Sequence, residues 1–141
     1  MPEDPTAAFQ PAFWAVKLVL ARASATAFAR HGVHEGQQYI LRCLWAEDGL
    51  PPGELAKRLG LATPTVTRAA ARMEAAGLIH REPDEHDRRL IRLYLTERGS
   101  TLEKVIAQEI DELSERALAS LDPTERAALV HYLDTIHRNL S

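Results

Sequence analysis

Threonine and arginine side chains recur at a helical spacing that suits the reading of DNA bases. Thr65, Arg68 and Arg72 stand at positions i, i+3 and i+7, so in a helix they project from one face. An arginine on such a face can donate two hydrogen bonds to guanine, and a threonine methyl group can pack on thymine. The opposite face would dock the helix on a core, because it carries Val66, Ala70 and Met73. The spacing therefore predicts a helix that lies in the major groove.

The start of this helix offers a second kind of contact. Thr63 is the expected N-cap, with Pro64 at the first helical position and Thr67 one turn further on. Free amide groups and the helix dipole favour a phosphate group at such an end. A threonine suits the N-cap whether or not DNA is bound, so the cap and the phosphate contact remain alternatives for Thr63.

Two further arginines are expected in a hairpin that follows the helix. Residues 78–80 and 91–95 favour extended strands, the second by its alternation of apolar and polar side chains. Arg88 and Arg89 stand in the polar stretch between them, where they could reach the DNA backbone or the minor groove. The competing interpretation of these residues, and of Arg68 and Arg72, is a solvated surface.

The elements that must position these groups follow from the periodicity of the apolar residues. It predicts four helices before the hairpin, over about residues 11–30, 40–45, 55–59 and 63–76. After the hairpin, Thr96 is the expected N-cap of a long helix, and Asp122 with Glu125 starts a last one. This order of four helices, a two-stranded hairpin and two helices predicts a mainly α fold, a winged helix-turn-helix with flanking helices.

The charge of the chain is unevenly distributed. The net charge is -3, but residues 57–98 carry nine Lys or Arg against six Asp or Glu, a local balance of +3, and the remainder stands at -6. A positive central module suits a polyanionic partner better than the total charge suggests. With 141 residues, of which 45% are hydrophobic and 26% charged, the chain is expected to form one globular domain.

The sequence lacks the motifs of common enzymes. It contains no glycine-rich phosphate loop, nucleophile elbow or HExxH helix, so neither enzymatic activity nor a cofactor is expected. The imidazoles and carboxylates of residues 80–87 lack a metal-ligand spacing, which favours a solvated loop over a metal site. Cys43 cannot form an internal disulfide and is interpreted as an inert thiol, with redox sensing as the alternative.

The N-terminal segment is the one apolar stretch that could direct the chain to a membrane. Lys17 and Arg22 interrupt it, so no membrane span is expected. Glu3 and Asp4 stand where a signal peptide would carry basic residues. We therefore expect a cytoplasmic protein.

The central third of the chain resembles a known family. LAKRLGL (55–61), TPTVTRAAARMEAAGLIHR (63–81) and DEHDRRLIRLYLTERG (84–99) are similar, in order and spacing, to segments of the MarR family of bacterial transcription regulators. The resemblance implies a homodimer on palindromic DNA, released by a small aromatic or phenolic effector, and we expect a repressor. It also implies that Asp87 orients Arg89 for the minor groove, and that the major groove is contacted by Thr65, Thr67, Arg68 and Arg72.

The resemblance also implies how the chain is organised. Residues 1–141 would form one domain, with the winged helix-turn-helix over 35–98 and dimerisation helices over 5–32 and 99–141. Apolar stripes on these outer helices exceed what the small winged core can cover; they comprise Phe9, Phe13, Val16, Leu20, Leu129, Leu133, Ile136 and Leu140. The alternative function is a winged-helix module for protein interaction, which would bind palindromic and random duplexes alike.

An effector pocket is expected where the first and second helices meet the helix after the hairpin. Trp14 and Trp45 would supply flat apolar walls, while Lys17, Arg42 and His34 would supply positive charge. That combination suits an aromatic carboxylate or a phenolate. The alternative is that both tryptophans belong to the core and that the cations are solvated.

Overall fold

The computed structural model describes residues 4–34 and 36–141, which form six helices and two strands. In chain order these are α1 (Pro5–Ala29), α2 (Gln37–Ala46), α3 (Pro52–Leu59), α4 (Thr63–Ala75), β1 (Ile79–Pro83), β2 (Ile91–Leu95), α5 (Glu97–Ala117) and α6 (Pro123–Leu140). The mainly α fold with one hairpin confirms the expected fold class. Two residues used in the sequence analysis lie outside these described ranges. They are residue 35, the expected start of the winged helix-turn-helix, and Glu3, which was used in the signal-peptide argument.

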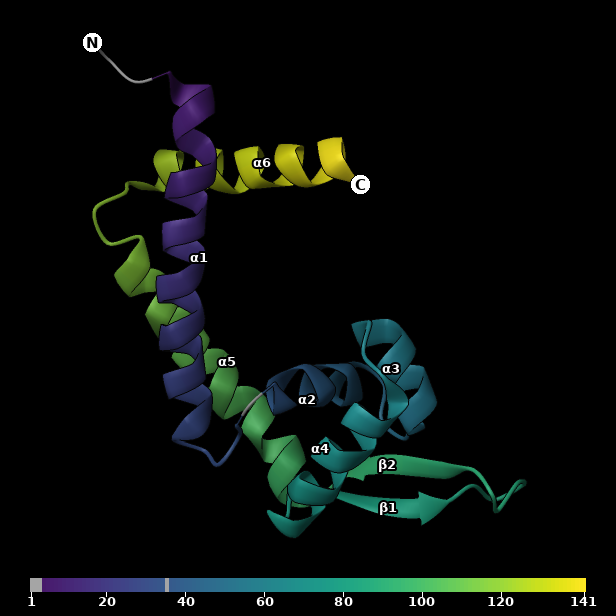
Figure 1. The fold of residues 1–141 in the computed structure, drawn as a ribbon. Coiled ribbons are helices and arrows are strands. Elements are labelled where there is room, and N and C mark those ends of the chain that lie inside the picture. The colour runs from purple at the N-terminus through teal and green to yellow at the C-terminus, as the bar shows by residue number, and fades with distance from the viewer. Residues whose placement is uncertain (1–3, 35) are drawn as a thin grey trace.

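The molecule has two parts, shown in Figure 1. In the first, which we call the limb, α1 lies beside α5, and α6 continues from the C-terminal end of α5. In the second, the lobe, α2, α3 and α4 pack together with the β1–β2 hairpin at the far end of α5. The elements that carry the expected DNA-contacting residues therefore all belong to the lobe.

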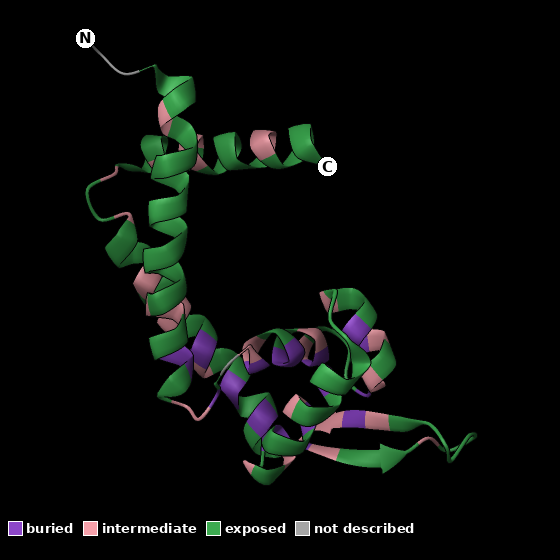
Figure 2. Ribbon diagram, in the orientation of Figure 1, coloured by how far each residue is buried: buried purple, intermediate pink, exposed green. Residues whose placement is uncertain are grey.

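The hydrophobic core lies in the lobe, as the colouring of Figure 2 shows. Each helix of the lobe turns one apolar face inward, and side chains such as Leu41, Leu55 and Val66 are completely buried. The limb contributes little to it: α1 buries only Ala27 and Phe28, both near its end. None of residues 123–140, all of which the structure describes, is buried. The outer helices thus keep the apolar surface that the sequence assigned to them.

The first helix begins earlier than the sequence suggested. The side chain of Asp4 accepts a hydrogen bond of 3.0 Å from the amide of Thr6, and Pro5 takes the first helical position. An acidic N-cap followed by proline is a strong start signal, so the expected start at Pro11 is wrong. Pro11 lies inside the helix, where it removes one backbone hydrogen bond without ending the helix.

The α1 helix is long and apolar, which bears on the expectation about membranes. By length and composition alone it could cross one, because an 18-residue window has a mean hydropathy of 1.3, and 11% of that window is buried. Lys17 and Arg22 lie within the helix but do not remove it from this range, so length and composition alone do not decide the expectation. Val19 and Trp14 are 66% and 57% exposed. The helix therefore presents an apolar surface that the chain itself does not cover.

The hairpin is longer and better anchored than the sequence predicted. Its two strands pair antiparallel from Ile79 opposite Leu95 to Pro83 opposite Ile91, so β1 extends three residues past the expected end. Proline is tolerated there because it closes the strand, where no further ladder hydrogen bond is needed. A short bridge between Leu50 and Leu93 adds a third segment beside β2. This bridge ties the α2–α3 connection to the hairpin.

Candidate nucleic-acid interface

The α4 helix is fixed to the lobe by its apolar face and exposes the opposite one. Val66, Ala70 and Met73 are at most 1% exposed, whereas the expected reading residues on the other face are exposed, namely Thr65, Thr67, Arg68 and Arg72. The turn before α4 is tight, because Gly60 ends α3 at a φ of 66°, a conformation that glycine adopts without strain. The structure thus presents the four side chains on a rigid support.

The start of α4 differs from the sequence interpretation. Ala62 is the N-cap, and Thr63 is already helical, so the expected cap by Thr63 is wrong. The backbone of Ala62 is extended (φ -74°, ψ 140°), so the last residue before the helix is Ala62. An alanine has no side-chain oxygen that could cap the helix. The hydroxyl of Thr67 donates to the carbonyl of Thr63 at 3.0 Å. Pro64 follows in the first turn.

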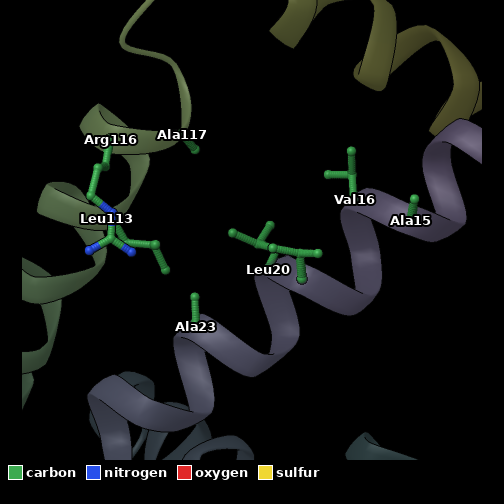
Figure 3. A pocket seen from close by; sticks show the side chains of 8 residues that line it. Ala15, Val16, Leu20, Ala23, Leu113, Arg116 and Ala117 are labelled. Atoms are coloured by element: carbon green, nitrogen blue, oxygen red, sulfur yellow. The ribbon is translucent and has the colours of Figure 1, made fainter.

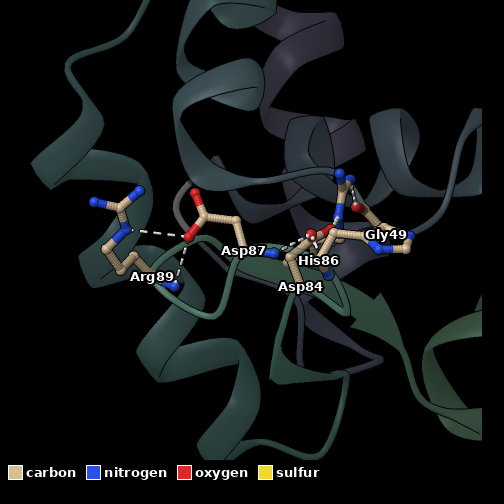
Figure 4. Close-up of polar contacts among 6 residues, drawn as sticks. Gly49, Asp84, His86, Asp87 and Arg89 are labelled. Carbon is tan, nitrogen blue, oxygen red and sulfur yellow. Dashed lines mark hydrogen bonds and ion pairs between the residues drawn. The ribbon is translucent and has the colours of Figure 1, made fainter.

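The hairpin, which we call the wing, is braced by Asp84, the first residue of the loop that joins its two strands. The carboxylate of Asp84 accepts a hydrogen bond of 2.6 Å from Nε of Arg92 and bonds from the amides of His86 and Asp87 at 3.0 and 2.9 Å. Arg92 also donates through Nη1 to the carbonyl of Gly49 at 2.9 Å. Figure 4 shows Gly49, Asp84 and His86 close together at this point. The Arg92 guanidinium, followed by the two amides, lowers the pKa of Asp84 to about 2.

The tip of the wing carries the two expected arginines. Nε of Arg89 lies 3.2 Å from Oδ1 of Asp87, and the Arg89 amide donates to the same oxygen at 3.1 Å (Figure 4). The Arg89 side chain is nonetheless 93% exposed. Arg88 is exposed as well. The wing therefore carries two cations into solvent, one of them oriented by a carboxylate.

Several other arginines of the lobe are engaged within the protein. Arg81 pairs with Glu74 at 2.9 Å, and the Arg81 amide, followed by its side chain, lowers the pKa of that carboxyl. Arg58 pairs with Glu47 and Glu54. Within residues 4–34 and 36–141, by contrast, no ion pair holds Arg68 or Arg88. The cations without an ion pair among these residues therefore include Arg68 on the outer face of α4 and Arg88 at the wing tip, where a polyanion could reach them.

Sequence reasoning missed two residues that shape this surface. Asp84 appeared only in a run of possible metal ligands, and Arg92 only as a polar position in a strand. The described residues contain no group of three His, Cys, Asp or Glu that could hold a metal ion. The sequence did contain a local signal for Asp84. An aspartate side chain often accepts hydrogen bonds from backbone amides a few positions later in a turn, as Asp84 does here. Its long-range partner Arg92 had no local signal.

The five residues expected to line an effector pocket do not surround one cavity. Lys17 lies over the ring of Trp14, 5.4 Å from its centroid, and both stand about 18–23 Å along the helix axis from Ala29, the last residue of α1, at about 1.5 Å per residue. Trp45 donates its indole N–H to the carbonyl of Gly99 at 2.9 Å and packs against the core. Arg42 lies over the ring of Phe28. These side chains are thus distributed over three separate places in the structure.

Two cavities lie elsewhere along α1. A groove of about 490 Å³ between α1 and α5 is lined by alanine, valine and leucine side chains with Arg116 at its edge, as Figure 3 shows. A second hollow of about 330 Å³ lies between α1 and α2 and is lined by residues that include Phe28 and His34. Of the five expected residues, His34 lines this hollow, and Arg42 stands over the ring of Phe28, which is one of its lining residues.

Comparisons with known proteins agree with the fold and the lobe. The MarR family profile matches residues 34–91. The transcriptional regulator TtmR of Methylorubrum extorquens is 34% identical over 91 residues, which are 64% of this chain and 47% of that protein. The chain thus aligns with about half the length of that relative. YybA of Bacillus subtilis, an uncharacterised HTH-type transcriptional regulator, is 25% identical over 74% of this chain and 70% of its own.

Solved structures extend the likeness to the limb. A MarR transcriptional regulator from Methanosarcina mazei Go1 is 28% identical with a TM-score of 0.76, covering 92% of this chain and 96% of its own. A MarR family protein from Bacillus stearothermophilus has a TM-score of 0.84 at 24% identity over 99% and 98% of the two chains, which shows a shared fold. Residues 34–91 therefore match the MarR family profile, and the chain as a whole shares the fold of MarR family proteins.

Proposed function

We propose that the chain is a sequence-specific DNA-binding transcription regulator that acts as a homodimeric repressor on an inverted repeat. The observation that carries this proposal is the exposed outer face of α4, held on the core beside a wing whose tip exposes Arg88 and Arg89. A helix of this size fits the major groove, and an arginine at a wing tip fits the minor groove. The names of the relatives, as transcriptional regulators, support the same function.

In this proposal each part of the lobe has its own contact. Thr65, Arg68 and Arg72 face base edges, while the first turn of α4 at Thr63, Pro64 and Thr67 lies against a phosphate. The wing places Arg89 in the minor groove, with Asp87 restricting the rotamers of its guanidinium. Phosphate contacts set the register on the duplex, and the base contacts supply the sequence preference.

The decisive experiment is selection of bound duplexes from a random pool, followed by binding of the selected duplex and of a scrambled one. We expect an inverted repeat with half-sites about one helical turn apart, ~10 bp between centres. Equal binding of both duplexes would favour the protein-interaction module instead. A reporter gene whose promoter overlaps the selected site should lose expression when the protein is present, and increased expression would contradict the repressor assignment.

A homodimer would explain the apolar surface of the outer helices. Val19 on α1 is 66% exposed, and Val130 and Tyr132 on α6 are 56% and 62% exposed. Surfaces of this kind are rarely left in water by a monomer, and a two-fold dimer would cover the same patch on each copy. It would also place two α4 helices at a fixed separation, as an inverted repeat requires.

Light scattering on wild type and on Val19→Glu tests the dimer. The substitution changes an exposed side chain, so the fold should be retained, while a buried carboxylate at the interface should yield monomers and weaken binding to the inverted repeat. Lys104→Glu on the exposed side of α5 is the matched control. A wild type that is monomeric at micromolar concentration and sediments with lipid vesicles would instead assign α1 to a membrane surface.

The effector is the remaining part of the proposal. We place a small aromatic or phenolic compound in the hollow between α1 and α2, where His34 lines the wall and Arg42 stands over Phe28. Arg42 would supply the charge for a carboxylate or phenolate. The hollow lies where the limb meets the lobe, so a ligand that prefers one arrangement of the two parts would shift DNA affinity. Trp14 and Lys17 form the alternative position, three to four turns earlier on α1.

A further inference from the structure

One arginine joins the C-terminal ends of two helices. Arg98, in the first turn of α5, donates through Nη1 to the carbonyl of Ala76, the C-cap of α4. Through Nη2 it donates to the carbonyl of His31 at 3.3 Å, in the turn that ends α1. The two carbonyls belong to residues 67 and 22 positions before Arg98. A single guanidinium therefore bridges the limb to the helix that carries the reading residues.

A glycine follows each of the two helix ends that this guanidinium contacts, and Gly32 leaves room for it. Gly32 and Gly77 follow α1 and α4 and both have a φ of 77°, the left-handed conformation that ends a helix. A Cβ at Gly32 would lie 3.1 Å from Nη2 of Arg98, and one at Gly77 would lie 3.9 Å from Nη1. The last carbonyls of a helix carry partial negative charge. The guanidinium of Arg98 therefore interacts favourably with the C-terminal end of each of the two helices.

The limb side of this link has a second attachment. Nε2 of His31 lies 3.2 Å from Oε1 of Glu109, and Nη1 of Arg30 lies 3.6 Å from the same oxygen. Arg98 and Glu109 are 11 positions apart on α5, about 16 Å at the helical rise. The end of α1 is thus attached to α5 at two points, Arg98 and Glu109. Because Arg98 also contacts the end of α4, the ends of α1 and α4 are both attached to α5.

We propose that Arg98 is a positioning residue, which sets the orientation of α4 on the limb and thereby the half-site spacing that a dimer reads. This inference rests on the proposed function, since it needs two copies of α4 on one duplex. Arg98 touches the C-terminal end of α4, away from Thr65 and Arg68. Loss of the link should therefore leave the base contacts of each α4 intact and relax their separation. Each added base pair moves a half-site by about 3.4 Å and ~35°, a change that a rigid pair of helices rejects.

The first test does not involve DNA. Arg98→Met keeps an unbranched apolar side chain and removes the guanidinium donors, and Lys104→Met on the exposed side of α5 is the matched control. Hydrogen exchange should become faster in Arg98→Met at residues 31–33 and at residues 76–78, two segments far apart in sequence, and stay unchanged in the control. Faster exchange at only one of the two segments, or at neither, would overturn the link.

The second test measures positioning. Binding is compared on the selected inverted repeat and on duplexes with one base pair inserted or removed between the half-sites. Wild type should prefer one spacing, and Arg98→Met should reduce that preference by between about two- and thirtyfold, the range of a coupling of this kind. Arg98→Lys, which can reach one carbonyl at a time, should give an intermediate value, and Lys104→Met should match wild type.

The outcomes separate the inference from the function on which it rests. A uniform loss of affinity at every spacing would mean that Arg98 contacts DNA or only stabilises the lobe, and it would overturn the positioning role. An unchanged spacing preference would do the same. A wild type with no preferred inverted repeat would instead reject the proposed function, while the exchange experiment would still decide whether Arg98 links the two helices.

Discussion

Oδ1 of Asp84 lies 2.6 Å from Nε of Arg92, and this pair joins the start of the wing's tip loop to β2. Arg92 connects it to the carbonyl of Gly49 at 2.9 Å, and Asp84 connects it to the turn that leads to Asp87 and Arg89. The exposed arginine at the tip thus depends on a chain of contacts that begins in the α2–α3 connection. The wing is therefore held as an extension of the lobe.

The first prediction concerns the wing at acid pH. The pKa of Asp84 is lowered from 3.8 to about 2, so its stabilisation is fully present above the unfolded value and is lost as the pH falls through about 2. The NMR shifts of the His86 and Asp87 amides, which donate to this carboxylate, should therefore titrate with a midpoint near 2. In Asp84→Asn this titration should disappear. A midpoint near 4 would contradict the assigned role of Arg92.

The second prediction concerns the close approach at Gly99. A Cβ at this position would overlap the carbonyl oxygen of Leu78, and that carbonyl is held in place by the amide of Thr96 at 3.1 Å. Backbone on both sides cannot give way as a side chain can, so Gly99→Ala should lower the free energy of unfolding by at least about 3 kcal/mol. Denaturant unfolding measures it.

Gly53 provides the matched control for this substitution. It lies inside α3, and a Cβ there would meet no atom within 4 Å among the described residues. Gly53→Ala should therefore raise the free energy of unfolding by about 0.5–1 kcal/mol, because alanine loses less conformational freedom in a helix. Equal effects of the two substitutions would mean that α5 does not approach Leu78 as closely as the structure places it.

The third prediction separates base reading from general affinity. Arg68→Ala should cost about 1–3 kcal/mol of binding free energy on the selected site and blur its sequence preference, and Arg72→Ala should do the same. Arg89→Ala should weaken selected and unselected duplexes more evenly, because the minor groove distinguishes bases poorly. Binding of each variant to both duplexes measures this. If Arg72→Ala bound the selected site as well as wild type does, the reading face of α4 would be assigned wrongly.

How well the sequence predicted each structural feature depended on how far apart in the sequence the contacting residues are. The N-cap at Thr96, which accepts from the amide of Gly99 at 3.1 Å, and the capping box of Asp122 with Glu125 were both predicted, because each involves residues three positions apart. Local rules failed where two start signals competed. Asp4 with Pro5 began α1 in place of Pro11, whose ring suits either a first turn or a tolerated interior position.

The contacts between distant segments were not predictable from the sequence. Trp45 suited an effector wall and a core position equally, and only the fold shows its hydrogen bond to Gly99, 54 positions away. The same holds for Arg98. In the sequence it is only a cation in the first turn of a predicted helix, and nothing there indicates its two distant carbonyl partners. The exposed face of α4 was predictable because Thr65, Arg68 and Arg72 follow a helical period. The candidate site was therefore predicted in its reading residues and missed in the residues that hold them.

The last prediction tests where an effector binds, by the fluorescence of the two tryptophans. Trp14 is 57% exposed and lies beside Lys17, whereas Trp45 packs on the core and donates to Gly99. Binding of an aromatic acid such as salicylate in the α1–α2 hollow should alter the emission of Trp45, which shares α2 with Arg42. Trp14→Phe should keep that response, and Arg42→Ala should lose it together with the fall in DNA affinity while still binding DNA without ligand.

Lys17→Ala is the matched control for Arg42→Ala, because both remove a cation beside an aromatic ring and only Arg42 is near the hollow. If Lys17→Ala abolished the response, the ligand would belong on the middle of α1 beside Trp14. If both variants kept the full response, neither position would hold the effector. Reciprocity gives an independent check, since a ligand that weakens DNA binding by some factor must itself bind more weakly, by the same factor, to the DNA complex.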